Sequence, residues 1–161
     1  MQWFLPDERA TLDAGFALGQ CMQEAGLHEG PGFHVRLQGD LGAGKTTLVR
    51  GVLRGLGYTG RVKSPTYPLL ETYRVGALSL AHFDLYRLES PEAFSEAGFD
   101  EYFVGPGLRF VEWPAQAGDH LPAADWRLTL ADAPDGGRVM TIDALSPTGL
   151  AGAALLERLH R

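Results

Sequence analysis

Apolar and polar residues recur along this chain with two different periods, one typical of strands and one typical of helices. Residues 33–37 alternate with a period of two, which predicts a strand. In residues 44–56, apolar side chains recur at intervals of three and four, which predicts a helix, and Gly57 is placed to end it in the left-handed conformation. The chain therefore contains a predicted strand, a short loop and a helix in that order.

The same two periods predict the other elements. Strands are expected at residues 2–5, 67–73, 78–84 and 108–112, and a hairpin at residues 126–130 and 139–142 around Asp135-Gly136-Gly137. Helices are expected from Pro6-Asp7-Glu8 to about Gly26, from Ser90-Pro91 to about Tyr102-Phe103, and at residues 148–159. This order predicts a three-layer α/β fold with a mixed sheet, antiparallel additions, and a C-terminal hairpin followed by a helix.

Helical spacing also predicts which sides of the first and last helices are buried. The predicted faces are Leu12, Phe16, Gly19 and Met22 in the first helix, and Leu150, Ala154, Leu155 and Leu159 in the last. Cys21, the only cysteine, is interpreted as a small buried hydrophobe and receives no functional role.

Composition is that of an ordinary soluble protein. With 161 residues, 45% of them hydrophobic and 21% charged, we expect one domain spanning residues 1–161. No apolar run approaches the roughly 18 residues of a membrane span, and residues 1–8 lack the basic start and apolar core of a signal peptide. We therefore expect a cytoplasmic protein with no membrane partner. The net charge of −6 argues against broad nucleic-acid binding.

Residues 39–46 read Gly-Asp-Leu-Gly-Ala-Gly-Lys-Thr, which fits the phosphate-binding pattern Gly-x4-Gly-Lys-Ser/Thr. Gly39, Gly42 and Gly44 allow successive N–H groups to point into one concavity. Lys45 adds a charge for the β- and γ-phosphates, and the Thr46 hydroxyl is a ligand for Mg²⁺. The alternative is a glycine-rich turn that matches by chance, which the flanking strand and helix disfavour.

Lysine is rare here, since Lys45 and Lys63 are the only two among 14 basic residues. A compact ammonium suits phosphate better than the planar fork of arginine. Five basic residues and no acid lie between positions 45 and 63. This run is interpreted as a solvated helix face, with nucleotide steering and docking of an acidic partner or RNA as the alternatives.

Two predicted strands end in a carboxylate, at Asp84 and Glu112. Such residues support Mg²⁺ in phosphate-loop enzymes, and Mg²⁺ needs only one or two of them. The alternative is a solvated strand end. His82, two residues before Asp84, is interpreted as structural rather than as a zinc ligand because no further ligand pair accompanies it.

Three further residues have a functional and an ordinary interpretation. Thr66 follows Ser64-Pro65 where a loop is expected to enter a strand, a position suited to sensing a γ-phosphate or Mg²⁺. Thr11 is either a hydrogen-bonding side chain near a nucleotide base or surface filler. Trp113 directly follows Glu112, so it is either a core residue or a gate or partner contact.

Taken together, these stretches resemble the bacterial TsaE family, also called YjeE. The resemblance rests on Pro6-Asp7-Glu8 with Ala10-Thr11-Leu12, residues 39–47, Val62 to Tyr67, His82 to Leu88, and Val111-Glu112-Trp113-Pro114, in family order and spacing over nearly the whole chain. The chain departs from the family after Trp-Pro, where the family often has an acidic or amide residue and this chain has Ala115 followed by Gln116.

The resemblance implies a small P-loop ATPase needed for threonylcarbamoyl modification of adenosine in tRNA. Its cofactors would be ATP and Mg²⁺, and its partners the TsaB and TsaD proteins, with tRNA reached through that complex. By resemblance, Thr46 and Glu112 hold Mg²⁺, Asp84 is needed for hydrolysis, and Ser64-Pro65-Thr66 behaves as a switch. We expect Lys45, Asp84 and Glu112 to be catalytic and Thr46, Glu112 and Asp84 to be the metal ligands. The expected nucleotide-binding residues are Thr11, Asp40, Gly42, Ala43, Gly44, Lys45, Thr46, Thr47, Thr66, Trp113 and Arg138.

Three other functions share features with this sequence. A small-molecule P-loop kinase is the main alternative, although no compact arginine-rich lid segment is evident. A GTP-dependent switch that reads guanine through Asn-Lys-x-Asp is excluded because the sequence contains no asparagine. Direct RNA binding is disfavoured by the acidic balance and by the lack of an aromatic RNA-reading motif.

Overall fold

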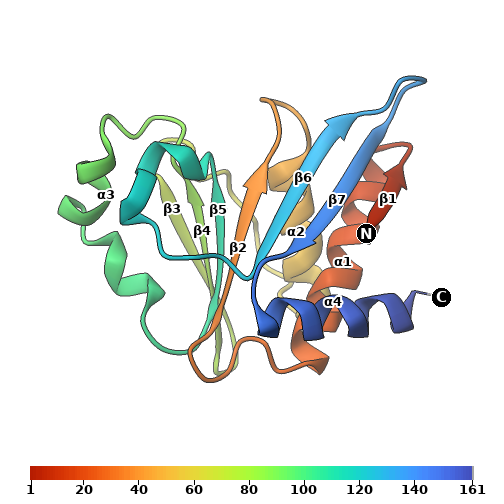
Figure 1. The fold of residues 1–161 in the computed structure, drawn as a ribbon, viewed down its shortest axis with the longest axis horizontal. Helices are drawn as coiled ribbons and strands as arrows, with labels where there is room; N and C mark the ends of the chain where they lie inside the picture. Colours follow the sequence, from red (N-terminus) through yellow and green to blue (C-terminus); the bar gives the residue numbers. More distant parts are fainter. Residues whose placement is uncertain (161) are drawn as a thin grey trace.

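Seven strands form one sheet with helices on both faces in the computed structural model, which describes residues 1–160 (Figure 1). The strands are β1 (Gln2–Leu5), β2 (Phe33–Gln38), β3 (Leu70–Val75), β4 (Leu78–Asp84), β5 (Leu108–Glu112), β6 (Trp126–Asp132) and β7 (Arg138–Ala144). The helices are α1 (Glu8–Glu24), α2 (Lys45–Gly55), α3 (Pro91–Glu96) and α4 (Pro147–Leu159), with short 3₁₀ segments η1 (Phe99–Phe103) and η2 (Pro114–His120). None of the helices in residues 1–160 is long and apolar enough to cross a membrane.

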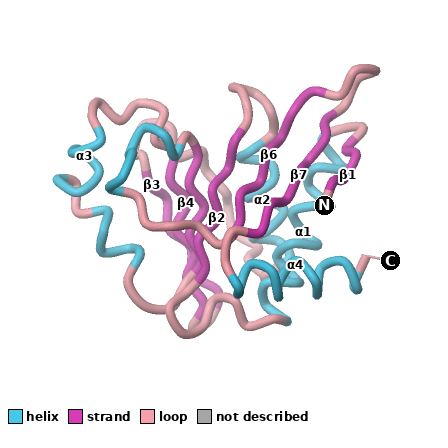
Figure 2. Tube along the Cα trace, viewed as in Figure 1, coloured by secondary structure: helices cyan, strands magenta, loops and turns pink. Residues whose placement is uncertain are grey.

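The sheet is mixed, with strand order β1-β7-β6-β2-β5-β4-β3. Its centre, β6-β2-β5-β4, is parallel, while β3 and the β7-β1 pair add antiparallel edges. The carboxyl ends of β2, β4 and β5 therefore meet at one edge, with Leu37 beside Glu112 and Glu112 beside Asp84. Figure 2 shows the loops after β2 and β4 and the turn between β6 and β7 at this same edge. The predicted α/β fold with antiparallel additions and a C-terminal hairpin plus helix is confirmed.

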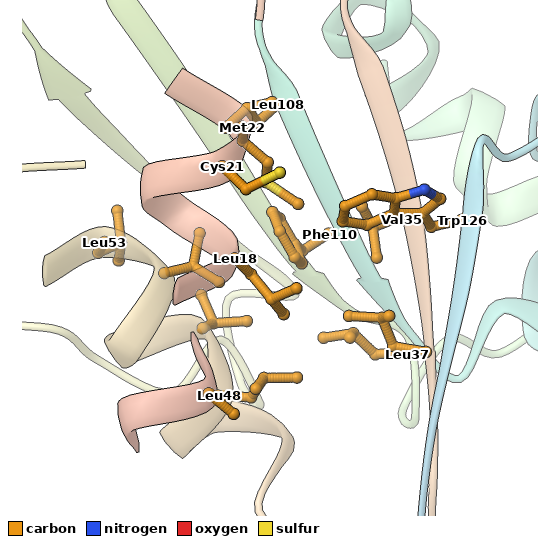
Figure 3. Packing of buried hydrophobic residues seen from close by; sticks show 14 of the residues in the cluster. Leu18, Cys21, Met22, Val35, Leu37, Leu48, Leu53, Leu108, Phe110 and Trp126 are labelled. Carbon is orange, nitrogen blue, oxygen red and sulfur yellow. The ribbon is translucent and has the colours of Figure 1, made fainter. Parts of the chain in front are cut away.

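Alternation along the central strands sends side chains to two cores. Leu80 of β4 and Phe110 of β5 face the core under α1 and α2, whereas Phe83 and Val111 face a second core under α3, η1 and η2. Figure 3 shows side chains of α1 and α2 in the first core, with Leu18 and Leu48 directed toward Val35 and Leu37 of β2. Because the sheet is covered on both faces, the central strands are almost continuously buried, as parallel strands usually are.

Helices α1 and α2 pack through glycines. A Cβ atom added to Gly15 of α1 would lie 2.2 Å from the carbonyl oxygen of Leu48, and one added to Gly51 of α2 would lie 2.3 Å from that of Leu12. Backbone therefore contacts backbone, and the close approach brings Thr11 against Gly44 at the start of α2. The predicted face of α1 is only partly right, since Phe16 is exposed.

Two predicted boundaries are wrong. Strand β3 begins at Leu70 rather than near Tyr67, because Leu69 has a φ of 65° and interrupts the extended chain. Thr66 consequently lies in a turn and not at the entrance of a strand. Helix α3 ends at Glu96 instead of continuing to Tyr102-Phe103, because Gly98 adopts a left-handed φ of 78° and the chain restarts as η1.

The last helix begins as expected but buries a different side. The Ser146 hydroxyl accepts a hydrogen bond from the Gly149 N–H and caps α4. Its buried residues are Gly149, Gly152 and Leu156, whereas Leu150 is 63% exposed. Gly152 allows α4 to approach the ring of Trp126, which explains why small residues form the buried stripe.

Candidate functional site

The glycine-rich loop between β2 and α2 has the conformation that its glycines permit. Gly39, Gly42 and Gly44 have φ values of 155°, 79° and 103°. At Gly39 a Cβ atom would lie 2.8 Å from the carbonyl oxygen of Leu130, so no other residue fits without movement. Gly44 precedes the first residue of α2 and has no side chain to cap it. The N–H groups of the first turn of α2 thus remain available to an anion, which the helix dipole also favours.

Lys45 is the first residue of α2, and its side chain is 6% exposed. Its Nζ donates a hydrogen bond to the Gly39 carbonyl oxygen at 2.6 Å and lies 3.9 Å from Glu112 Oε1 and 4.0 Å above the ring centre of Trp113. Burial lowers the pKa of this ammonium, while nearby carboxylates, Glu112 most of all, oppose the shift. The ammonium of Lys45 is therefore held against the glycine-rich loop by its bond to Gly39.

Asp84 and Glu112 end β4 and β5 and are neighbours across the sheet. They are 7% and 3% exposed, which is uncommon for carboxylates and requires specific partners. Asp84 accepts hydrogen bonds from the Tyr86 N–H at 3.0 Å and from the Thr66 hydroxyl at 3.3 Å. Glu112 Oε2 lies 2.6 Å from Nε2 of His82. Both carboxylates are thus fixed before any ligand arrives.

The turn before β3 contacts this edge of the sheet through Thr66. The Ser64 and Thr66 hydroxyls lie 2.7 Å apart, and Thr66 continues the chain of hydrogen bonds to Asp84. Tyr67, the next residue, is 81% exposed. The guanidinium of Arg87 lies over its ring, with the Cζ atom 4.8 Å from the ring centre. A movement of Thr66 would therefore break or lengthen a hydrogen bond to Asp84.

Two cavities meet at the glycine-rich loop. The inner cavity, about 310 Å³, is called here the phosphate chamber and is lined by Leu41, Gly42, Ala43, Gly44, Lys45, Thr46, Thr47, Ser64, Thr66, Asp84, Glu112 and Trp113. The second cavity, about 430 Å³, is called the outer pocket and is lined by Leu5, Pro6, Asp7, Glu8, Thr11, Gly42, Ala43, Gly44, Thr47, Gly137 and Arg138. Gly42, Ala43, Gly44 and Thr47 line both, so one elongated ligand can occupy the two together.

Most of the chain matches one known protein family. The family model "Threonylcarbamoyl adenosine biosynthesis protein TsaE" matches residues 5–140, a range that includes every residue of the phosphate chamber and the outer pocket. The chain belongs to the TsaE family.

Individual TsaE proteins and a solved structure support the same assignment. The TsaE protein of Haemophilus influenzae is 43% identical over 122 residues, which is 76% of each chain. That of Treponema pallidum is 37% identical over 132 residues, covering 82% of this chain and 92% of its own. The crystal structure of YdiB from Bacillus subtilis matches with a TM-score of 0.80 and 30% identity, over 100% of this chain and 96% of that one. The fold is thus of the P-loop nucleotide-binding type.

The sequence-predicted site residues of this TsaE family member divide into three groups. Those from Gly42 to Thr47, with Thr66, Asp84, Glu112 and Trp113, line the phosphate chamber. Thr11 and Arg138 line the outer pocket instead. Asp40 lines neither, since it is exposed and borders a smaller cavity of about 240 Å³ beside Trp113 and Pro114.

Arg138 contacts the glycine-rich loop through backbone oxygens. Its guanidinium donates to the carbonyl oxygens of Ala43 and Gly42, both at 3.3 Å, and pairs with Asp132 across the hairpin. The hairpin is therefore attached to the loop by one side chain. Nothing in the sequence indicated this contact, because the partners are 95 and 96 positions apart.

Two residues of the site were not among the individual site residues expected from the sequence. Ser64, expected only as part of the Ser64-Pro65-Thr66 switch, lines the phosphate chamber. His82 contacts Glu112, and the signal that could have indicated it was its position two residues before Asp84 on the same strand face. Trp113, by contrast, was singled out, and its φ of 56° shows a backbone conformation that is uncommon outside glycine.

The oxygen ligands in the phosphate chamber fit Mg²⁺. Thr46, Asp84 and Glu112 supply one hydroxyl and two carboxylates, the hard donors that this ion prefers. In residues 1–160, no three His, Cys, Asp or Glu side chains gather closely enough to hold a metal ion by themselves. Mg²⁺ usually keeps several waters and shares its coordination with substrate phosphates, so a small set of protein ligands is what such a site needs.

Proposed function

We propose that this TsaE family member binds Mg²⁺–ATP in the phosphate chamber and hydrolyses it as an accessory protein in the biosynthesis of threonylcarbamoyladenosine in tRNA. The observation that carries the proposal is the convergence of three buried charged side chains, Lys45, Asp84 and Glu112, on the mouth of the glycine-rich loop. Buried charges are costly unless they are paired and hydrogen-bonded, and charged groups that gather in a cleft mark a candidate functional site.

Phosphate binding falls to the loop and to Lys45. The N–H groups at the start of α2 would bind the β- and γ-phosphates, and Lys45, now hydrogen-bonded to the Gly39 carbonyl oxygen, would turn to a phosphate oxygen. Mg²⁺ held by Thr46 and Glu112 would neutralise developing charge on the phosphates. Asp84, held by Tyr86 and Thr66, would orient the attacking water or a metal-bound one.

The outer pocket suits the nucleoside. It lies between the start of α1 and the hairpin, and it shares Gly42, Ala43 and Gly44 with the phosphate chamber. Thr11 donates its hydroxyl hydrogen bond to the Asp7 carbonyl oxygen at 3.4 Å, a weak contact that it can give up. A base and ribose in this pocket would therefore contact Thr11 at one side and Arg138 at the other.

Partners and location follow from the family. We propose that the chain acts with the TsaB and TsaD proteins, that tRNA is reached through that complex, and that the protein works in the cytoplasm as one domain. The support is the TsaE match over residues 5–140. Hydrolysis would then reset the complex and phosphorylate no substrate.

Turnover of ATP labelled on its γ-phosphate tests this function. We expect slow release of labelled phosphate by the protein alone and a clear rise when TsaB and TsaD are added. Asp84→Asn serves as the control, since it should bind nucleotide but release no phosphate, whereas a contaminating ATPase would be unaffected. Label that moves to a small molecule of a cell extract, with no response to the partners, would instead establish a P-loop kinase.

A further inference from the structure

His82 is a fully buried histidine beside the phosphate chamber. It lies on β4, two residues before Asp84 and on the same face of the sheet, and its exposed fraction is 0%. Its Nε2 atom is 2.6 Å from Glu112 Oε2 on the neighbouring strand β5. Its Nδ1 atom is buried and has no hydrogen-bond partner in the described part of the chain.

The contact fixes one oxygen of Glu112 and leaves the other free. An ionised carboxylate only accepts hydrogen bonds, so Nε2 carries the hydrogen. The bond is short and charge-assisted, which makes it strong and directional. With Oε2 held by His82, Oε1 is directed toward Lys45, 3.9 Å away, on the side of the phosphate chamber.

A purely structural role explains this arrangement less well. Core packing alone favours an apolar side chain at position 82, since the buried and unpartnered Nδ1 lowers stability. The only polar contact of the ring in residues 1–160 is with Glu112. The bond to Glu112 therefore explains a histidine at position 82, whereas packing in the surrounding core does not.

We propose that His82 is a positioning residue for the metal ligand Glu112. It holds Oε2 at the floor of the site so that Oε1 is presented, in one rotamer, to the Mg²⁺ of the bound nucleotide. Outer partners of this kind orient metal ligands in many proteins. The inference rests on the proposed function, because it assigns His82 a task only if Mg²⁺–nucleotide binds in the phosphate chamber.

The test measures how much Mg²⁺ strengthens ATP binding, by calorimetry with Mg²⁺ and with a chelator. His82→Leu removes the bond at similar volume. In His82→Gln the amide nitrogen reaches the Nε2 position, and in His82→Asn it reaches only the Nδ1 position. We expect the strengthening by Mg²⁺ to fall roughly tenfold or more in the Leu and Asn variants and to be largely restored in Gln. Binding in chelator should be unchanged in all three.

Two controls separate positioning from folding. His34→Leu makes the same change at another buried histidine, on β2, and should leave the Mg²⁺ effect intact. In a Glu112→Gln background, His82→Leu should cause no additional loss, because the bond it removes has already lost its carboxylate. If His82→Leu does not fold, the comparison of Gln with Asn decides.

The outcomes are distinct. Wild-type Mg²⁺ dependence in His82→Leu or His82→Asn would overturn the positioning role. An equal loss of ATP binding with and without Mg²⁺ would also overturn it, because the histidine would then support the whole loop. A wild-type protein whose ATP affinity is indifferent to Mg²⁺ would overturn the proposed function together with this inference.

Discussion

Arg138 shows how one side chain prepares the phosphate loop. Its hydrogen bonds to the carbonyl oxygens of Gly42 and Ala43 orient two peptide groups. Because the peptide group is planar and trans, holding the Ala43 carbonyl toward Arg138 turns the N–H of Gly44 the opposite way. We infer that Arg138 orients the peptide groups of the glycine-rich loop by holding their carbonyl oxygens, in addition to lining the outer pocket.

Replacing Arg138 tests this inference. We expect Arg138→Ala to weaken binding of both ATP and inorganic tripolyphosphate by about tenfold, roughly the value of one lost hydrogen bond from a charged donor. Arg127→Ala, at an arginine that pairs with Asp143 in the same hairpin, is the matched control and should bind normally. Calorimetry with each ligand gives the answer. If ATP binding falls while tripolyphosphate binding does not, Arg138 contacts the nucleoside and does not organise the loop.

At this scale the sequence predicted residues but not their partners. The glycine-rich loop, Asp84 and Glu112 were recognisable because each lies in a short local pattern. The contacts of His82 with Glu112, of Thr66 with Asp84 and of Arg138 with the loop join positions 18 to 96 residues apart. Such contacts depend on strand order and register, which local patterns do not contain.

The α1–α2 pair is the element that carries the site. Gly15 and Gly19 of α1 oppose Gly51 and Gly55 of α2, and each would place a Cβ atom 2.2 or 2.3 Å from a carbonyl oxygen of the other helix. This contact fixes the start of α2, and with it Lys45, relative to the start of α1 that borders the outer pocket. Packing between the two helices thus sets the position of Lys45 relative to the outer pocket.

We expect Gly51→Ala to destabilise the protein by about 2 kcal/mol, because overpacking outweighs the better helix propensity of alanine. The helices would have to separate, so ATP affinity should fall as well. Urea unfolding measures the first effect and calorimetry the second. Gln20→Ala, at an exposed position of α1, is the control and should change neither. A Gly51→Ala variant as stable as wild type would show that the two helices are free to separate.

Glycines also explain where element prediction failed. Hydrophobic spacing assigned Phe16 and Leu150 to buried faces, yet they are 42% and 63% exposed. The faces that pack closest to other elements contain Gly15 in α1 and Gly152 in α4, neither of which belonged to a predicted face. Periodicity of large apolar residues identifies helices well, but it gives little weight to small residues that allow the closest contacts.

On the scale of the whole molecule, the fold class could be predicted and the arrangement of the sheet could not. The strand–loop–helix order and the carboxylate-ended strands indicated a P-loop α/β fold. That β6 lies beside β2, and that β1 pairs with β7 at the far edge, follows from contacts between distant parts of the chain. This arrangement brings Arg138 of the hairpin to the glycine-rich loop, and Gly137 and Arg138 line one side of the outer pocket.

Binding of Mg²⁺–ATP in the phosphate chamber depends, in this proposal, on Lys45, and calorimetry on two lysine variants tests that dependence. The chain offers a matched control, because its only other lysine, Lys63, is exposed and lies outside the chamber lining. We expect Lys45→Ala to lose about 100-fold in affinity for Mg²⁺–ATP, the scale of losing one charge-assisted hydrogen bond to phosphate, while Lys63→Ala binds as wild type does. Wild-type affinity in Lys45→Ala would show that the phosphate chamber is not the ATP site.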